Sequence, residues 1–516
     1  MSGFAKVLFI GLDSAEPELL LNWIDAGVMP TFRALQNSAL WGAVATPPGL
    51  GNGATWPTLF TGVSAARHGR YHWNQFRPES YQTARFNEDT EYRHEPFWAV
   101  LSRAGRRVAV IDMVKAPLTS GINGIQLADW TTHGRTWPMR SWPPLLTDQV
   151  TARFGADPVG GHTDLPKGSP RRSPEQDKLL RDQLVDRVRI KTDLSCYYLE
   201  QGGWDLFATV FGEPHDIGHQ CWHLHDPAHP LHDPDWRRRF GDPIKDVYVA
   251  LDAALAALLA RAGEATVVVF TGPGMGPHYT ANDTLDTILC HLEGRRPVPR
   301  AAARKTLKSV CQRALPGTVR KRIGTLFHTV TRNGKEYRKC FAVRHNLDSG
   351  AIRINLVGRE PNGQVRPGTD YDTFCDQLTQ DLQELVNLDS GEPLVKEVIR
   401  VRDVYKGQYA DKLPDLLVRW NRRVPINWIS SPKIGKIKNE SLGNRTGDHT
   451  QNALFFAQGP RINPGRPLHA TPIEAIAPSI AALLGVPLPE ADAPPLKAWL
   501  GTFKHPNPQL DGSPVT

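Results

Sequence analysis

The stretch "KVLFIGLDSAEPELLLNWIDAG", residues 6–27, contains an apolar run, an acidic residue and a helical pattern, in that order. The run at 6–12 is apolar without alternation, which is typical of a β-strand covered on both faces. Asp13 follows directly, and it lies where sheets of the α/β class gather their ligands. The stretch therefore predicts a buried strand, a functional or helix-capping Asp13, and a helix behind it.

Three more runs have the same character: "RVAVIDM" (107–113), "DLFATVF" (205–211) and "ATVVVFT" (265–271). Helical patterns lie between the runs, such as "PFWAVLSRAG" before the first and "IKDVYVALDAALAALLARAG" before the third. Alternating strands and helices predict an α/β fold, a largely parallel sheet flanked by helices on both faces. Residues just beyond each run are then the candidates for function.

The chain has 516 residues, enough for one large α/β unit with inserted cap segments. We expect a core formed by residues 1–290 and 346–500, a basic helical insertion at 291–345 and a tail at 501–516. A hydrophobic share of 40% and a charged share of 22% argue against general disorder. The sequence gives no indication of the oligomeric state.

Cellular location is indicated by two absences in the sequence. No apolar run approaches the roughly 18 residues that a membrane span needs. The six cysteines include no CxxC pair, which argues against a disulfide framework and against a thiolate zinc site. We expect a cytoplasmic location.

Positive charge is concentrated in one segment. Residues 295–339 contain fourteen Lys or Arg and one acid, whereas the whole chain has a net charge of only +8. We interpret the segment first as the exposed face of a cap helix. A platform for a polyanionic substrate and contact with an anionic membrane surface are the alternatives. Nucleic acid is not expected as a partner, because no recognised binding motif is present.

Histidines gather in "GEPHDIGHQCWHLHDPAH", residues 212–229. His215 and His219 are four residues apart, so one helical turn would place both imidazoles on one face, a spacing suited to a divalent metal such as zinc. Asp216 is the alternative to His215. A metal site also needs a ligand from a distant segment, and His449 in "NRTGDHTQNALFFAQGP" is the candidate.

A candidate nucleophile lies in "GNGATWPTLFTGVSAARHG", residues 51–69. Thr55 before Trp56-Pro57 suits the start of a helix, because Thr is a good N-cap and Pro is tolerated in the first turn. A hydroxyl at a helix N-terminus is a reasonable nucleophile, since free amides there favour an anion. The alternative is a capping Thr without chemistry.

Together these segments resemble the alkaline phosphatase superfamily, and within it the type I phosphodiesterase/nucleotide pyrophosphatase group. The resemblance continues through "AIRINLVGREPNG" and "IAPSIAALLGVPLP" and covers nearly the whole chain. It implies two metal ions, commonly zinc, which share a phosphate and a Thr or Ser nucleophile. Asp13, His219 and His449 fall on ligand positions of that pattern.

The sequence departs from the family pattern at three places. Gly272-Pro273 replace an Asp-His pair of metal ligands, and His278 is the candidate to compensate. His215 occupies a position usually held by Asp. The nucleophile position falls on Asn52 when the helix is aligned by Thr61-Gly62, and on Thr55 when it is aligned by Trp56-Pro57. We favour Thr55, because a helix starting at Asn52 would have Pro57 in its interior.

These observations predict a metal-dependent hydrolase of phosphodiesters or related phosphoryl or sulfuryl esters, acting on a small anionic substrate. One zinc ion, or manganese, would be well held and a second weak or absent. Thr55 or a metal-activated water would attack, Asp13 would act as base, and Asn52 and Arg445 would bind the substrate. The alternatives are a catalytically silent member that binds a phosphorylated ligand or partner, and a member redirected to transfer or isomerisation.

Overall fold

The computed structural model describes residues 6–77, 79–132, 137–165, 169–296, 336–346, 348–440, 443–467 and 469–501. Most of the predicted basic insertion at 291–345 and nearly all of the predicted tail at 501–516 lie outside these ranges, as does most of the segment considered for membrane contact. Among the described residues, no helix is both long and apolar enough to span a membrane.

The centre of the fold is a nine-stranded sheet with the order β20-β2-β19-β9-β1-β8-β5-β6-β7. Its strands are β1 (Val7–Leu12), β2 (Leu40–Ala45), β5 (Val108–Ile111), β6 (Gly124–Ala128), β7 (Arg140–Trp142), β8 (Leu206–Phe211), β9 (Thr266–Phe270), β19 (Leu454–Gln458) and β20 (Thr471–Pro472). The four predicted apolar runs are β1, β5, β8 and β9, and they lie side by side in parallel pairing. The sheet is mixed, because β19 runs antiparallel to both of its neighbours and β7 to β6.

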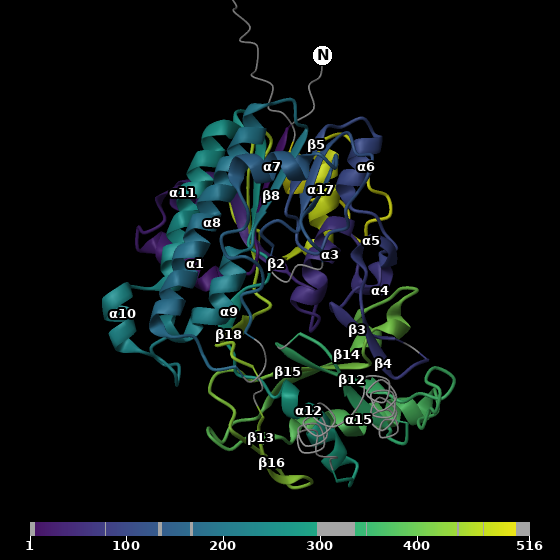
Figure 1. Cartoon of the computed structure of the whole chain (residues 1–516). Coiled ribbons are helices and arrows are strands. Elements are labelled where there is room, and N and C mark those ends of the chain that lie inside the picture. The colour runs from purple at the N-terminus through teal and green to yellow at the C-terminus, as the bar shows by residue number, and fades with distance from the viewer. Residues whose placement is uncertain are drawn as a thin grey trace, which may run out of the picture.

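Helices cover both faces of this sheet (Figure 1). One face carries α1 (Pro17–Asp25), α2 (Pro30–Ser38), α8 (Pro174–Glu200), α9 (Glu213–His225) and α11 (Pro243–Ala262); the other carries α3 (Asn52–Thr61), α6 (Phe97–Arg103) and α17 (Ile476–Leu483). Further helices are α4 (Ala65–His68), α5 (Glu88–Glu91), α7 (Leu146–Phe154), α10 (Pro234–Phe240) and α16 (Val401–Val404).

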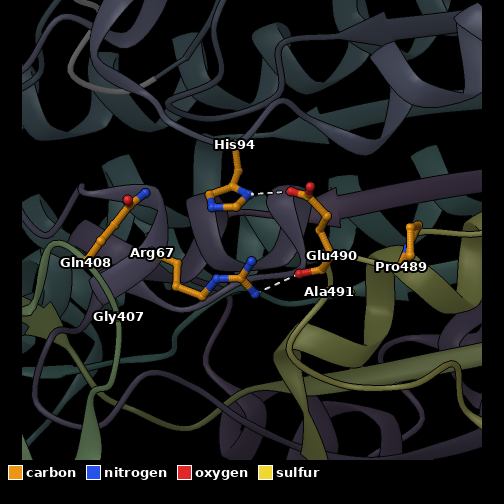
Figure 2. A pocket seen from close by; sticks show the side chains of 7 residues that line it. All are labelled: Arg67, His94, Gly407, Gln408, Pro489, Glu490 and Ala491. Atoms are coloured by element: carbon orange, nitrogen blue, oxygen red, sulfur yellow. Dashed lines mark hydrogen bonds and ion pairs between the residues drawn. The ribbon is translucent and has the colours of Figure 1, made fainter.

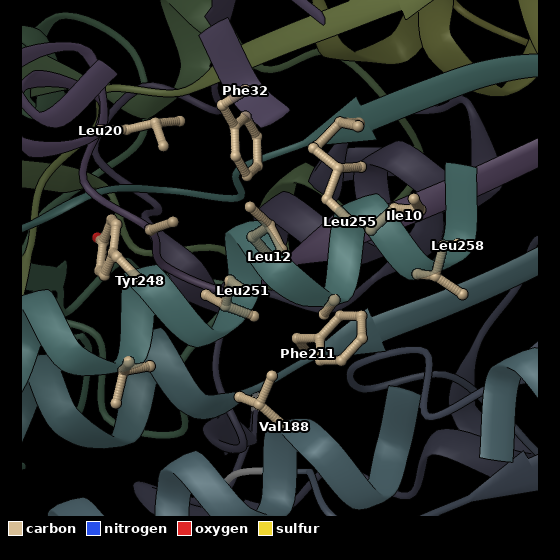
Figure 3. Packing of buried hydrophobic residues seen from close by; sticks show 14 of the residues in the cluster. Ile10, Leu12, Leu20, Phe32, Val188, Phe211, Tyr248, Leu251, Leu255 and Leu258 are labelled. Carbon is tan, nitrogen blue, oxygen red and sulfur yellow. The ribbon is translucent and has the colours of Figure 1, made fainter. Parts of the chain in front are cut away.

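The side chains of β1 show why its sequence does not alternate. Leu8 and Ile10 pack into the core under α11, whereas Val7 and Phe9 pack into the core under α3. Figure 3 shows the first of these cores, where Ile10 lies among side chains of α11 and β8. Both faces of the strand are therefore apolar, as the sequence predicted, and its free carboxyl end is left for polar residues.

A second, smaller layer packs below the main sheet (Figure 1). Its strands form two antiparallel sheets, β11 (Cys340–Val343), β12 (Ser349–Ile354), β15 (Leu416–Trp420) and β14 (Val395–Arg400) in the first, and β13 (Val386–Asn387), β16 (Trp428–Ser431) and β17 (Gly435–Lys438) in the second. Helices α12 (Asn282–Leu292) and α15 (Thr369–Gln383) complete its core. A short hairpin, β3 (Asn74–Arg77) and β4 (Gln82–Arg85), lies nearby.

The sheets divide the chain differently from the predicted boundaries. We expected residues 346–500 to continue the core, but the strands between 340 and 438 form the smaller sheets, and the main sheet resumes only with β19. The reason is local: β14 and β17 carry exposed charged residues and pair antiparallel, which suits a sheet with one solvated face. The smaller layer approaches the carboxyl end of the main sheet, where the candidate site lies.

Candidate metal centre

Helix α9 follows β8 after a single residue and carries two of the predicted ligands. Pro214 lies in its first turn, where a missing N–H costs no helical hydrogen bond. His215 and His219 are both buried on one face of the helix, with ring centroids 4.7 Å apart. The four-residue spacing therefore places both imidazoles on one face of α9, as the sequence predicted.

The third histidine is supplied by a short strand pair. β18 (Gly447–His449) pairs antiparallel with β10 (Met275–Pro277), which belongs to the Gly- and Pro-rich segment after β9. Gly447 lies so close to α9 that a Cβ there would be 2.1 Å from the backbone oxygen of Gly218. This close approach lets the Gly447 carbonyl accept a 2.8 Å hydrogen bond from His219 Nδ1, and it brings His449 to the helix.

The segment at 270–279 thus positions a ligand through backbone pairing and does not supply one. His278, the candidate to compensate for the missing Asp-His pair, lies 3.0 Å from Asp448 through its Nδ1. It is not part of the histidine cluster. That a second metal ion is weakly held or absent stays a prediction.

His215, His219 and His449 form the candidate metal centre. Their ring centroids lie 4.6 to 4.7 Å apart, and one potential ligand atom from each lies within 4.8 Å of the others. Outer hydrogen bonds orient two of the rings: Asp13 Oδ2 lies 2.7 Å from His215 Nδ1, and the Gly447 carbonyl holds His219 Nδ1. These bonds leave Nε2 of His215 and of His219 for a metal. Three buried imidazoles, two of them oriented through their outer nitrogens, fit a divalent metal ion such as zinc with an open position.

Asp13 lies behind the cluster and is not one of its members. Its carboxylate is fully buried, and Oδ1 accepts a 2.7 Å hydrogen bond from Trp56 Nε1 while Oδ2 contacts His215. The predicted role of Asp13 as a metal ligand or base stays a prediction; in the structure its carboxylate contacts His215 Nδ1.

Asp216 points away from the cluster. Its carboxylate accepts a 2.6 Å hydrogen bond from Arg187 Nη1 and a 2.7 Å bond from the Thr163 hydroxyl. Successive helical residues point about 100° apart, so His215 and Asp216 cannot both face the same site. Of the two residues that the sequence left as alternatives, His215 is the one that lies in the cluster with His219.

The helix that carries the nucleophile position begins at Asn52, with Gly51 as N-cap. The prediction that Thr55 begins this helix was wrong. Pro57 is tolerated inside the helix because Arg70 Nη1 donates a 2.6 Å hydrogen bond to the Gly53 carbonyl, which Pro57 cannot reach with an N–H. The Thr55 hydroxyl is fully buried and donates to the Gly51 carbonyl at 2.9 Å, so it is not directed at the histidines.

Asn52 lies at the centre of the site. Its Nδ2 is 3.1 Å from His449 Nε2 and 3.4 Å from His215 Nδ1. Its carbonyl oxygen Oδ1 accepts a 2.5 Å hydrogen bond from Lys115 Nζ, which also donates to the Asn52 backbone oxygen at 2.7 Å. Burial lowers the pKa of Lys115 to about 7, although Asp13 opposes the shift.

Arg445, which the sequence predicts to bind the substrate, lies beside the cluster. Its guanidinium is paired with Asp164, and Nη1 lies 2.9 Å from His219 Nε2. A metal ion on His219 requires this guanidinium to turn away from Nε2. Arg445 therefore adds positive charge at the edge of the site.

Two site residues were not predicted from the sequence. Lys115 lies four residues beyond β5, and the rule that selected Asp13 after β1 could have selected it. Ser14 has a φ of 64°, and its hydroxyl lies 3.2 Å from His449 Nδ1 and 3.3 Å from His215 Nδ1. Nothing in its sequence context distinguishes it from an ordinary turn serine.

Several buried histidines are held in their neutral form. Burial lowers the pKa of His72 and of His449 to about 3 and that of His345 to about 4, and it takes the pKa of His219 well below the usual value of 6.5. Neutral imidazoles are the form that binds metal.

The same shifts predict acid sensitivity of the fold. The unfolded chain binds protons on these histidines at about pH 6.5, whereas the folded chain does not, so the free energy of unfolding should fall as the pH drops from about 6.5 toward 4. Urea midpoints measured at pH 8, 6.5, 5 and 4 in the metal-free protein test this. Equal midpoints at pH 6.5 and 4 would contradict it.

A separate surface pocket of about 640 Å³ lies away from the cluster (Figure 2). Its charged side chains are already paired: Arg67 donates to the Glu490 backbone oxygen at 2.7 Å, and His94 lies 3.3 Å from the Glu490 carboxylate. None of the three histidines lines this pocket. We therefore do not connect it with the reaction.

The family model described as type I phosphodiesterase/nucleotide pyrophosphatase matches residues 7–427, which include all the site residues except Arg445 and His449. No curated protein gives a significant match in sequence.

Among solved structures, alkaline phosphatase PafA is similar with a TM-score of 0.51 and 12% identity over 96% of this chain and 99% of that chain. Phosphonoacetate hydrolase from Sinorhizobium meliloti 1021, in complex with phosphonoformate, gives 0.49 and 14% identity over 93% and 96%. Murine ectonucleotide pyrophosphatase/phosphodiesterase 5, in complex with AMP, gives 0.47 and 15% identity over 94% and 96%. The first of these likenesses supports an alkaline phosphatase-like fold.

Proposed function

Because the chain belongs to the type I phosphodiesterase/nucleotide pyrophosphatase family of phosphoryl ester hydrolases, we propose that it hydrolyses phosphodiesters or related phosphoryl or sulfuryl esters with a single divalent metal ion. Zinc is the expected ion and manganese the alternative. The observation that carries the proposal is the buried cluster of His215, His219 and His449. A metal there would supply Lewis acidity to a non-bridging oxygen of the substrate.

The charge of the site favours an anionic substrate. Three neutral imidazoles do not offset the charge of a divalent ion, and Asp13, the carboxylate that contacts one of them, carries a single negative charge. Lys115 lies nearby through Asn52. Asn52 Nδ2 lies beside His449 and His215, where it would donate a hydrogen bond to a phosphoryl oxygen held at the cluster. Lys115 holds the Asn52 side chain through Oδ1, which directs Nδ2 toward the histidines.

Water is the attacking group in this proposal. An amide at Asn52 cannot act as a nucleophile, and the Thr55 hydroxyl is directed at Gly51. In this proposal Thr55 has a structural role instead of the predicted catalytic one, and Asn52 orients the phosphoryl group.

Metal analysis of the purified protein, beside hydrolysis of bis-p-nitrophenyl phosphate and p-nitrophenyl phosphate, tests the function. We expect about one tightly bound metal per chain, turnover of at least one ester, and loss of turnover on chelation that zinc or manganese restores. No turnover by the metal-loaded protein would contradict the proposal and favour a silent member that binds a phosphorylated ligand, the reading that Asn52 and Gly272-Pro273 also permit.

Two substitutions in α3 separate the roles of its residues. Thr55→Val keeps the shape of the side chain and removes only the hydroxyl, so activity should stay within about threefold of wild type while stability falls by about 1 kcal/mol. Asn52→Ala should lower kcat by about 100-fold, because a donor to the phosphoryl oxygen is lost. Steady-state kinetics with bis-p-nitrophenyl phosphate measure both. Loss of activity in Thr55→Val with bound metal retained would restore Thr55 as the nucleophile.

A further inference from the structure

The hydroxyl of Ser14 lies between two histidines of the candidate metal centre and the carboxylate behind them. Its Oγ is 3.2 Å from His449 Nδ1, 3.3 Å from His215 Nδ1 and 3.3 Å from Asp13 Oδ1. Ser14 is fully buried, and buried polar groups are nearly always paired. The hydroxyl therefore takes its hydrogen bonds from groups of the metal centre itself.

The backbone holds Ser14 in this place in a strained conformation. Its φ of 64° lies in the left-handed region, which residues other than glycine seldom adopt. The N–H groups on either side are fixed at the sheet: that of Asp13 donates to the Phe211 carbonyl at 2.8 Å, and that of Ala15 to the Thr271 carbonyl at 3.1 Å. Strain of this kind persists only where surrounding contacts enforce it, and it gathers at functional sites. The conformation therefore points to a role for the Ser14 hydroxyl.

Gly272, two residues beyond β9, packs directly against this turn. It has a φ of 66°, and a Cβ there would lie 3.0 Å from the Ser14 backbone nitrogen and 3.5 Å from the Asp13 Cα. A side chain at position 272 would press on the backbone that presents the Ser14 hydroxyl. The lack of a side-chain ligand at this position and the placement of Ser14 are therefore linked.

The directions of the hydrogen bonds follow from their partners. His449 Nε2 lies 3.1 Å from Asn52 Nδ2, which donates, because Lys115 fixes the other end of the amide by donating to Oδ1. His449 Nε2 therefore accepts, and the proton of the neutral ring is on Nδ1, from which it is donated to Ser14 Oγ. Ser14 in turn donates its own proton to Asp13 Oδ1. A ring that binds a metal through Nε2 has the same tautomer.

We propose that Ser14 relays the Asp13 carboxylate to His449 and thereby orients this ligand ring. One carboxylate then positions two of the three histidines, His215 directly through Oδ2 and His449 through the Ser14 hydroxyl. The third ring is held by a backbone carbonyl. Outer partners of this kind fix the tautomer and the orientation of a ligand ring. The inference rests on the metal ion of the proposed function, and Ser14, which acts through His449, is a positioning residue.

Ser14→Gly tests the relay, because it removes the hydroxyl and also relieves the backbone. Glycine adopts a φ of 64° without strain, which offsets the lost hydrogen bonds, so the melting temperature of the metal-free protein should stay within about 3 °C of wild type. The dissociation constant for zinc, measured by competition with a chromophoric chelator, should rise by about 10- to 100-fold. Metal affinity then falls while stability is kept, a result that a purely structural role would not produce.

Glu79→Gly is the matched control. Glu79 is exposed, has a φ of 63° and lies outside the histidine cluster, so the same kind of backbone change occurs away from the site. Its zinc affinity should equal that of wild type. The link through the carboxylate is tested by adding Ser14→Gly to Asp13→Asn. Because the carboxylate is then already absent, the further loss of zinc affinity should be less than about threefold.

The outcomes separate the relay from the proposed function. Unchanged zinc affinity in Ser14→Gly would overturn the relay, and loss of turnover beside it would point to the hydroxyl as an attacking group. Full additivity of the Ser14 and Asp13 substitutions would also overturn it. A wild-type protein that binds zinc but hydrolyses no ester would contradict the proposed hydrolysis alone, because the relay is measured by zinc affinity. A wild-type protein that binds no zinc would overturn both.

Discussion

Replacing His219 by alanine is expected to remove the bound metal and to lower ester hydrolysis by more than about 100-fold. Loss of an outer hydrogen bond to a metal ligand alone costs about 10- to 100-fold, and His219→Ala removes the ligand itself. The position cannot be filled by a neighbour, because Asp216 is bound to Arg187 and His278 to Asp448. Metal content by plasma mass spectrometry and kcat for bis-p-nitrophenyl phosphate measure the two effects.

The matched control is His469→Ala, since His469 is exposed and lies outside the cluster. Metal content and activity should both be unchanged in it. Full activity of His219→Ala without bound metal would exclude a metal-dependent reaction. Full activity with the metal retained would show that other ligands hold the ion.

Replacing Arg187 by methionine is expected to destabilise the fold by about 3–5 kcal/mol, because it leaves buried acids without their cation. Arg187 in α8 has a side chain only 1% exposed; it contacts Asp157 through Nε at 2.9 Å and Asp216 through Nη1 at 2.6 Å. Glu213, fully buried, lies 3.9 Å from Nε, and burial raises the pKa of its carboxyl. Desolvation of these acids is no longer offset once the guanidinium is gone.

Arg189→Met provides the control on the same helix. Its side chain is 64% exposed and pairs only with Asp186 and Asp193 among the described residues, so the free energy of unfolding should stay within about 0.5 kcal/mol of wild type. Urea unfolding at pH 7 measures both variants. Equal midpoints for Arg187→Met and wild type would show that the buried acids are protonated in the folded state.

The four adjacent strands β9, β1, β8 and β5 of the main sheet were predictable, because burial on both faces leaves a continuous apolar run in each. The smaller layer was not, because strands such as β14 and β17 are short and partly exposed, so their sequences resemble loops. Pairing among them is decided by contacts between distant segments. The residue pattern within one strand does not show which distant strand pairs with it.

The metal centre was predictable to the extent that one helical turn fixes the relation of His215 to His219. The choice between Asn52 and Thr55 was not, since the argument from Pro57 considered the helix alone. Arg70, thirteen residues beyond Pro57, supplies the missing hydrogen bond, and only the folded chain shows it.

The position of β19 in the sheet affects how the chain folds during synthesis. This strand lies between β9 and β2 in the sheet, and β18 with His449 precedes it directly in the chain. During synthesis, β2 therefore has no neighbour until nearly nine-tenths of the chain has been made, and pairing over such separations is slow and leaves strand edges exposed. The histidine triad is completed by the same event that closes the sheet, so a nascent or truncated chain would be both inactive and prone to aggregate.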